Sequence, residues 1–336
     1  LFGALVSSIR AVVCGVVLAA GVLAPARTVT GQKTALPTPA SILGYEPGAD
    51  RQLPTWKQIT DYFTALDKAS PRVTTRILGK TTLGRPFLAV FIADSSTLAN
   101  LDRYKQIQRK LMDPRLRKPG ELQQLLLDGK NVILITSSIH STEVGGFTTP
   151  LVLADRLARG ETADAKSVLA NTIVILVPSQ NPDGVDIVGD WYRSTLDTKS
   201  EGTEPPQLYH KYTGHDNNRD FYMMNQPESV NINRMLYREW FPQIVYNHHQ
   251  TGPTGTVMFS PPFRDPFNYV YDPIIVNELD QVGAAMHTRF DVEGKPGVTT
   301  RSGSNYSTWW NGGLRTMPYF HNEIGLLTES IGNPTP

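Results

Sequence analysis

Apolar and polar positions follow the two periods of a mixed α/β protein. Short apolar runs bounded by turn residues are typical of strands. Segments with apolar residues three or four positions apart are typical of helices. Strands are predicted at residues 73–78, 87–93, 132–137, 172–177, 243–246 and 324–327.

Helices are predicted between these strands. Thr55 and Gln58 form a capping box before an amphipathic helix with Trp56 and Ile59 on its apolar side. A further helix is predicted at 147–159, and another begins at Asp272-Pro273.

The order of these elements predicts the architecture. Strands that alternate with helices favour an α/β fold, a three-layer α/β/α sandwich around a mixed, mostly parallel central sheet. The sequence shows no internal repeat and no linker, so we expect one domain. Residues 191–215 and 251–270 look irregular and are the expected walls of a substrate cleft.

Composition adds little to this picture. The chain has 336 residues, 40% of them hydrophobic, which is enough for a large core. A net charge of +1 argues against a nucleic-acid partner. The basic stretch 103–118 is interpreted as a solvated helix and loop face. Nothing in the sequence indicates the oligomeric state.

The N-terminal segment is typical of an export signal. Arg10 precedes an apolar run at 11–23, and Ala24-Pro25-Ala26 fits a cleavage site. The run is shorter than the about 20 residues that span a bilayer. We expect a signal peptide at 1–26, an extension at 27–51 and a secreted or periplasmic mature protein with no membrane association. The alternative is an uncleaved membrane anchor.

A histidine and a glutamate follow the apolar run at 131–137. His140 and Glu143 are three residues apart at the predicted carboxyl end of this strand, where α/β sheets bind ligands. Imidazole and carboxylate are both zinc ligands, so the pair predicts two sides of a metal site. The alternative is a surface loop with an unrelated histidine.

A second strand ends in two histidines. Residues 241–250 read FPQIVYNHHQ and contain His248 and His249. Catalytic zinc commonly takes three protein ligands, and one of these two would complete the set with His140 and Glu143. Neighbouring residues on a strand face opposite sides, so we expect only one of them to bind, and the pattern does not say which.

Five short motifs carry a family resemblance. They are HSTE at 140–143, NPDG at 181–184, NNRD at 217–220, NHHQTG at 247–252 and GLLTES at 325–330. In this order they resemble the zinc metallocarboxypeptidases related to carboxypeptidase A. The segment 54–94 is similar to that family's first helix, turn and strand, so the resemblance covers about 52–331.

The resemblance implies a metal set with one zinc per chain. His140 and Glu143 match the first two zinc ligands. His249 matches the third when NHHQTG is aligned on its Q-x-G end, and His248 is the fallback.

The resemblance also implies the substrate-binding and catalytic residues. Asn218 and Arg219 match the pair that binds the terminal carboxylate of a peptide, a task that suits the planar guanidinium. Glu329 matches the catalytic glutamate, and Glu323 is a weaker candidate. Arg193 is the expected counterpart of the arginine that stabilises the oxyanion.

Two further positions are less well matched. NPDG reads as a turn with a structural role, because proline fixes φ and Asp-Gly favours tight geometry. The family's mobile tyrosine has two candidate counterparts here, Tyr306 and Tyr271, and the motifs do not choose between them.

The implied function is a secreted zinc metallocarboxypeptidase acting on peptides or proteins with a free C-terminus. One alternative is a zinc amidase or peptidase acting on bacterial cell-wall peptides, which the pocket near Asn305 and Tyr306 together with Arg219 would distinguish. Another is a non-catalytic binding module on the same fold. The family usually continues with a helix after the catalytic glutamate, so we expect the catalytic domain at 52–336 to be truncated or followed by further domains.

Overall fold

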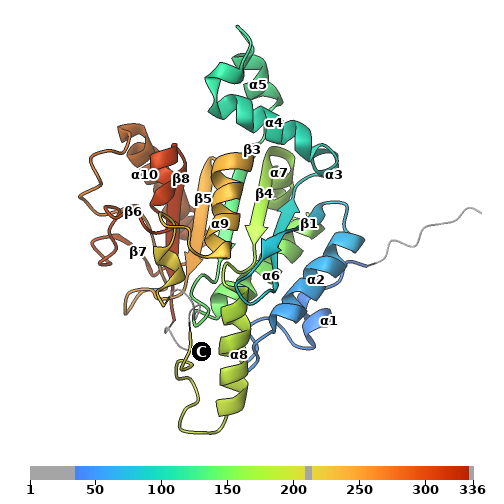
Figure 1. Ribbon diagram of the computed structural model, residues 1–336, viewed down its shortest axis with the longest axis vertical. Helices are drawn as coiled ribbons and strands as arrows, with labels where there is room; N and C mark the ends of the chain where they lie inside the picture. Colours follow the sequence, from blue (N-terminus) through green and yellow to red (C-terminus); the bar gives the residue numbers. More distant parts are fainter. Residues whose placement is uncertain (1–34, 209–213, 333–336) are drawn as a thin grey trace, which may run out of the picture. The chain divides into compact units, whose positions relative to one another are not determined.

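The computed structural model describes residues 35–208 and 214–332 of the chain. Its centre is one eight-stranded sheet in the order β1-β2-β4-β3-β5-β8-β6-β7 (Figure 1). The predicted signal peptide at 1–26 lies outside the described residues. Within the described ranges, no helix combines the length and the apolar character that a membrane crossing requires.

The sheet is mixed, with a parallel centre. β4, β3, β5 and β8 run parallel to one another, whereas β1 and β2 are antiparallel, as are β2 and β4, and β6 runs antiparallel to β8. β6 and β7 pair in parallel. The strands are β1 Val73–Lys80, β2 Pro86–Ile92, β3 Asn131–Ser137, β4 Thr172–Val177, β5 Ile244–His249, β6 Met258–Phe263, β7 Val298–Arg301 and β8 Ile324–Ser330.

Helices connect these strands. The α-helices are α1 Pro39–Leu43, α2 Trp56–Ala69, α3 Ser95–Leu98, α4 Leu101–Met112, α5 Leu122–Asp128, α6 Gly145–Arg159, α7 Ala163–Asn171, α8 Pro182–Thr195, α9 Pro227–Arg234 and α10 Pro273–Val292. Short 3-10 segments are η1 Pro114–Leu116, η2 Asn217–Arg219 and η4 Met317–His321, and η3 Met235–Trp240 is a π-helix.

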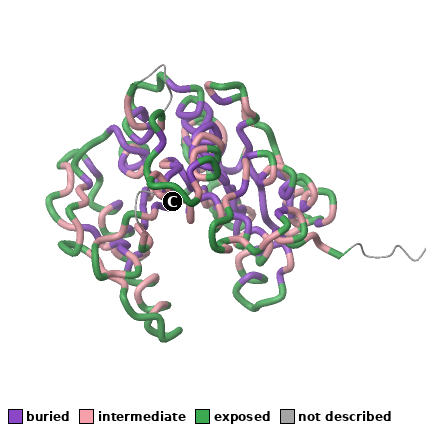
Figure 2. Tube along the Cα trace, turned by 90° about the horizontal axis from the view of Figure 1, so that it is seen from below, coloured by how far each residue is buried: buried purple, intermediate pink, exposed green. Residues whose placement is uncertain are grey.

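Helices cover both faces of the sheet, as the sandwich prediction requires. Alternate residues of β2 show this directly. Phe87, Ala89 and Phe91 share an apolar cluster with residues of α4, α5, α9 and η3 on one face. Leu88 and Val90 share another with residues of α2, α6, α7 and α8 on the opposite face. A third apolar cluster joins α10 to β6 and β8. Figure 2 shows the buried residues gathered in the interior and the exposed ones on the outer turns and loops. The predicted α/β fold is confirmed.

Local sequence signals explain the first helices. The Thr55 side chain accepts from Gln58 N, and the Gln58 side chain accepts from Thr55 N, so the predicted capping box is present. Helix α1 packs on this region, since Leu43 is buried in the same cluster as α2 and its carbonyl accepts from Gln58. Part of the predicted extension therefore packs against the body of the fold.

Two segments that were predicted to be irregular contain regular structure. β6 lies within 251–270, and the Pro261-Pro262 pair inside it obscures the strand pattern, because proline cannot donate to a sheet. Helix α8 extends to Thr195, into the segment that begins at residue 191. NPDG is therefore not an isolated turn: Asn181 caps α8 by accepting from Gly184 N at 3.0 Å, and Pro182 is the first helical residue.

Candidate metal and catalytic site

The site lies at the carboxyl ends of three adjacent parallel strands, β3, β5 and β8. Ser137 at the end of β3 pairs with His248 of β5, and His249 pairs with Glu329 of β8. Parallel strands that end together bring the residues that follow them to one edge of the sheet. Three segments far apart in the sequence therefore contribute side chains to one place.

A tight turn after β3 orients the first two candidate ligands. Glu143 N donates to His140 O at 3.1 Å, and Gly146 N donates to Glu143 O at 2.8 Å. Glycine at position 146 permits this turn, because a Cβ there would lie 3.0 Å from Ser138 N. The turn leads directly into α6, so both side chains are fixed between a strand and a helix.

Strand alternation separates the two candidate histidines. β5 extends through both, so His248 and His249 face opposite sides of the sheet. His249 lies beside Glu143, with Nδ1 3.1 Å from Oε2. His248 instead lies 3.2 Å from the hydroxyl of Tyr246 and from that of Thr328. The structure thus brings His249, and not His248, to His140 and Glu143.

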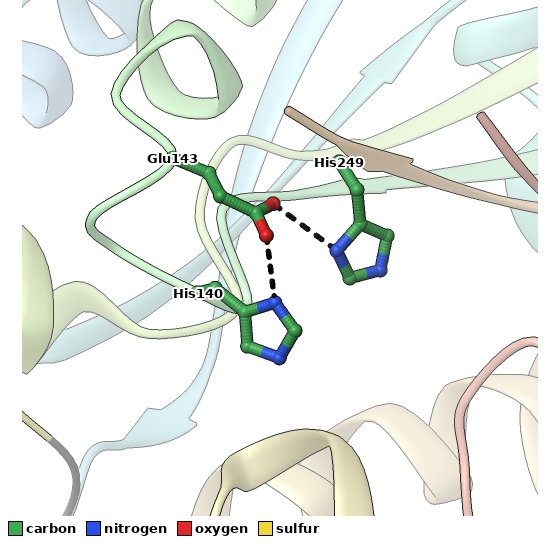
Figure 3. Close-up of side chains that lie close together, drawn as sticks. All are labelled: His140, Glu143 and His249. Carbon is green, nitrogen blue, oxygen red and sulfur yellow. Dashed lines mark hydrogen bonds and ion pairs between the residues drawn. The ribbon is translucent and has the colours of Figure 1, made fainter. Parts of the chain in front are cut away.

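These three side chains form a group that fits zinc. One ligand atom from each lies within 4.8 Å of the other two, and Figure 3 shows both imidazoles turned toward the same carboxylate. His140 Nδ1 lies 2.9 Å from Glu143 Oε1, and the His140 and His249 ring centres are 4.9 Å apart. Two imidazoles and one carboxylate are a donor set of catalytic zinc sites that leaves a fourth position for water.

Asp216 contacts the His140 ring on the side opposite to Glu143. Its Oδ1 lies 3.0 Å from His140 Nε2, the nitrogen that faces away from Glu143. Burial alone would lower the pKa of His140, yet the bonds to Asp216 and Glu143 raise that pKa to about 10. A metal must therefore displace a proton from this ring, so we expect metal binding to release protons.

Glu143 is held as a carboxylate by four partners. Besides the two histidines, it accepts from Gln250 N at 3.0 Å and from the hydroxyl of Thr251 at 3.0 Å. Burial alone would raise the pKa of Glu143, but the charge of His249 and the hydrogen bonds to His140 and His249 lower that pKa far below 4.5. The side chain is therefore ionised and oriented, as a metal ligand must be.

Glu329 lies at the same edge of the sheet, whereas Glu323 lies at the other. Thr251 N donates to Glu329 Oε2 at 2.8 Å, which ties this carboxylate to the loop after His249. Glu323 precedes β8, and six strand residues correspond to about 20 Å. The structure therefore favours Glu329 over Glu323 as the predicted catalytic glutamate.

The predicted substrate-binding pair lies on η2, next to Asp216. Arg219 Nη1 is 3.6 Å from Asp216 Oδ2, and its guanidinium lies 5.4 Å from the ring centre of Trp310. Asn218 is buried, and its side-chain oxygen accepts from Leu314 N at 3.0 Å. The structure thus brings Arg219 close to the metal-binding group, with about half of its side chain exposed.

Arg193 is not brought to this group. Its guanidinium donates to Leu53 O at 3.0 Å and to Asp190 at 2.8 Å. Because α8 begins at Pro182, Arg193 lies about 16 Å further along the helix axis. With its guanidinium bonded to Leu53 and Asp190, the predicted oxyanion role of Arg193 has no structural support.

The two tyrosines considered for substrate closure both pack against other aromatic side chains. Tyr306 lies against Phe263, with ring centres 4.4 Å apart, and burial raises the pKa of Tyr306 to about 12. Tyr271 donates to Thr308 O at 2.6 Å and is buried, whereas Tyr306 is partly buried. Trp310, which the sequence did not single out, is partly exposed beside Arg219.

Comparison with known proteins identifies the family. The family model described as "Zinc carboxypeptidase" matches residues 59–325. This is most of the chain, and the chain belongs to the zinc carboxypeptidase family. A comparison with curated proteins gave no match. The predicted zinc cofactor is confirmed at the level of this family, whose members use zinc.

Solved structures share the fold at low sequence identity. A metallo-carboxypeptidase from Burkholderia cenocepacia is 15% identical with a TM-score of 0.55, and the match covers 81% of this chain and 59% of that one. Thrombin activatable fibrinolysis inhibitor is 14% identical with a TM-score of 0.59, covering 87% and 70%. Carboxypeptidase A from Helicoverpa armigera is 15% identical with a TM-score of 0.56, also covering 87% and 70%.

Proposed function

We propose that this protein is a zinc-dependent metallocarboxypeptidase that hydrolyses the C-terminal peptide bond of peptide or protein substrates. The observation that supports this most is the meeting of His140, Glu143 and His249 with Glu329 beside them. All four come from the carboxyl ends of β3, β5 and β8 or the turns that follow. A non-catalytic module would need none of this arrangement.

Each side chain has a chemical task in this proposal. Zinc held by His140, Glu143 and His249 would lower the pKa of water toward about 7 and polarise the scissile carbonyl. Glu329 accepts a proton from the attacking water and then passes it to the departing amide nitrogen, acting first as a base and then as an acid. Burial, the largest cause, raises the pKa of Glu329, and the negative charge of Glu143 raises it further. A raised pKa suits a carboxylate that must take up a proton and then give it away.

Arg219 determines where the substrate is cut. A guanidinium that binds a free carboxylate through two parallel hydrogen bonds selects the end of a chain. Its position beside Asp216 places this anchor next to the ligand His140. The proposal is therefore an exopeptidase, with Asn218 supporting the loop that presents Arg219.

One experiment tests the reaction. The purified protein is analysed for metal and assayed on a panel of C-terminally varied peptides, with Glu329→Gln as the matched variant. We expect about one zinc per chain, release of single amino acids that a chelator stops, and a variant that binds zinc but is at least about 100-fold slower. Release of internal fragments would contradict the exopeptidase assignment, and chelator-resistant turnover would contradict the mechanism.

Export of the protein is also part of the proposal. Arg10, the apolar run at 11–23 and Ala24-Pro25-Ala26 support a cleaved signal peptide. Fractionation of cells expressing the chain, followed by N-terminal sequencing, tests this. We expect a product that begins after Ala26 outside the cytoplasm. A product that remains attached to membranes with the segment intact would contradict it.

A further inference from the structure

A buried asparagine lies on the same side of β5 as the third metal ligand. Asn247 and His249 are two residues apart on the strand, so they face the same way. Asn247 Oδ1 lies 2.6 Å from His249 Nε2, the ring nitrogen turned away from Glu143. Asn247 is fully buried and His249 is 2% exposed, so water does not compete for this bond.

The orientation of the Asn247 amide is fixed by a second bond. Its Nδ2 donates to the hydroxyl oxygen of Thr136 at 2.9 Å. The Thr136 hydroxyl in turn donates to Tyr246 O at 3.4 Å, so its lone pairs remain available to accept from the amide. The amide nitrogen therefore faces Thr136, and the amide oxygen must face His249.

The sheet itself holds this pair together. Thr136 and Asn247 are direct partners in the parallel pairing of β3 with β5. His140 follows the same strand β3, so one strand pair positions both histidine ligands. Thr136 and Asn247 therefore belong to strands of the central sheet and not to a surface loop.

An amide oxygen can only accept a hydrogen bond, and this decides the state of the imidazole. A neutral histidine has one N–H and one lone pair, so a proton on Nε2 leaves the lone pair on Nδ1. His249 Nδ1 is the atom that faces Glu143 and His140. His140 has a charged partner, Asp216, in the equivalent place, whereas the partner of His249 is neutral.

We propose that Asn247, anchored by Thr136, is a positioning residue that fixes the tautomer and ring orientation of His249 for metal binding. This inference rests on the zinc site of the proposed function. Partners of this kind typically change metal affinity about 10- to 100-fold when they are removed.

The test measures zinc affinity, by competition with a chromophoric chelator, for the full chain and three variants. Asn247→Leu keeps the volume of the side chain but cannot accept, and we expect about 10- to 100-fold weaker binding. Asn247→Asp keeps an acceptor and should restore most of the affinity. Thr136→Val removes the anchor alone and should give a smaller loss than Asn247→Leu.

Nitrogen NMR of the histidine rings and thermal unfolding of the metal-free proteins complete the experiment. We expect the Nε2–H tautomer of His249 in the wild type and a mixture of tautomers in Asn247→Leu. Equal zinc affinity of the wild type and a folded Asn247→Leu would overturn the inference while leaving the zinc site intact. A wild type that binds no zinc would overturn the proposed function itself. Should Asn247→Leu not fold, Asn247→Ala is measured instead, with the same two outcomes.

Discussion

The backbone N–H of Thr251 donates to Glu329 at 2.8 Å, so the residue that follows the third candidate ligand by two positions also holds the proposed catalytic base. The hydroxyl of the same threonine donates to Glu143 at 3.0 Å. Thr251 therefore hydrogen-bonds both the candidate metal ligand Glu143 and the proposed base Glu329, and it holds the two carboxylates in place relative to each other.

Removing the Thr251 hydroxyl should loosen Glu143 without removing a ligand. A hydrogen bond to a charged group contributes about 1.5–3 kcal/mol, so we expect Thr251→Val to lower zinc affinity by about 10-fold or more. Chelator competition measures this. Thr251→Ser keeps the hydroxyl and should bind like the wild type. Equal loss in both variants would show that the methyl group, and not the hydroxyl, is important.

The acid limb of activity should follow Glu329. Burial, the largest cause, raises the pKa of Glu329 above 4.5, and a general base acts only when it is deprotonated. We expect kcat/KM to fall as the pH drops through a value above 4.5. A pH profile of the zinc-loaded enzyme on one peptide measures this limb. An acid limb at or below 4.5 would contradict the assignment of Glu329 as the base.

The two predicted arginines should behave differently. Arg219→Ala removes the proposed carboxylate anchor, and we expect KM for peptides to rise about 10- to 100-fold. Arg193→Ala should leave kcat/KM unchanged, because its side chain bonds to Leu53 and Asp190 instead of the site. Steady-state kinetics on a free peptide and its C-terminal amide distinguish the two roles. A large loss of kcat in Arg193→Ala would restore its predicted oxyanion role.

Glu323 should make stability depend on pH. Burial raises the pKa of Glu323 well above 4.5, so the folded protein holds this proton more tightly than the unfolded chain does. Its contribution to stability is complete below the unfolded pKa of about 4.5 and is lost as the pH rises through the folded pKa. We expect Glu323→Gln to be more stable than the wild type by on the order of 1 kcal/mol at neutral pH and no more stable at acid pH.

Thermal unfolding at both pH values measures this difference. Glu204→Gln, at an exposed position, serves as the control and should change the melting temperature at neither pH. An equal shift for Glu323→Gln at both pH values would mean that burial of the ionised carboxylate is not the cause.

The strands and the metal-binding group were predictable because their signals are local. β3 spans Asn131–Ser137, one residue longer than the strand predicted at 132–137, and His140 and Glu143 follow it in one turn. Thr251 lies inside the NHHQTG motif and Asp216 directly precedes NNRD, but no short-range pattern shows that they contact Glu143 and His140. These contacts depend on segments more than 70 residues apart, as with Asp216 and His140 at a separation of 76.

The less successful predictions also have physical causes. NPDG has turn chemistry, yet Asn181 is followed by Pro182 at the first helical position, and the same residues begin α8. This helix extends toward Arg193 and places it away from the site. Tyr306 was one of two candidates for the mobile tyrosine, but its ring packs against Phe259 and Phe263 of β6. The choice between His248 and His249 required the register of β5, which a single sequence does not contain.

The alternation in β5 has an evolutionary consequence. An insertion of one residue before Tyr246 would leave an imidazole at the metal, since His248 would take the place of His249. Tyr246 would then stand where Asn247 stands now, and a phenol would replace the amide behind the ring. This shift would keep two imidazoles and one carboxylate at the metal but would replace the amide that hydrogen-bonds the second imidazole. We expect it to persist only in lineages that no longer need tight zinc binding.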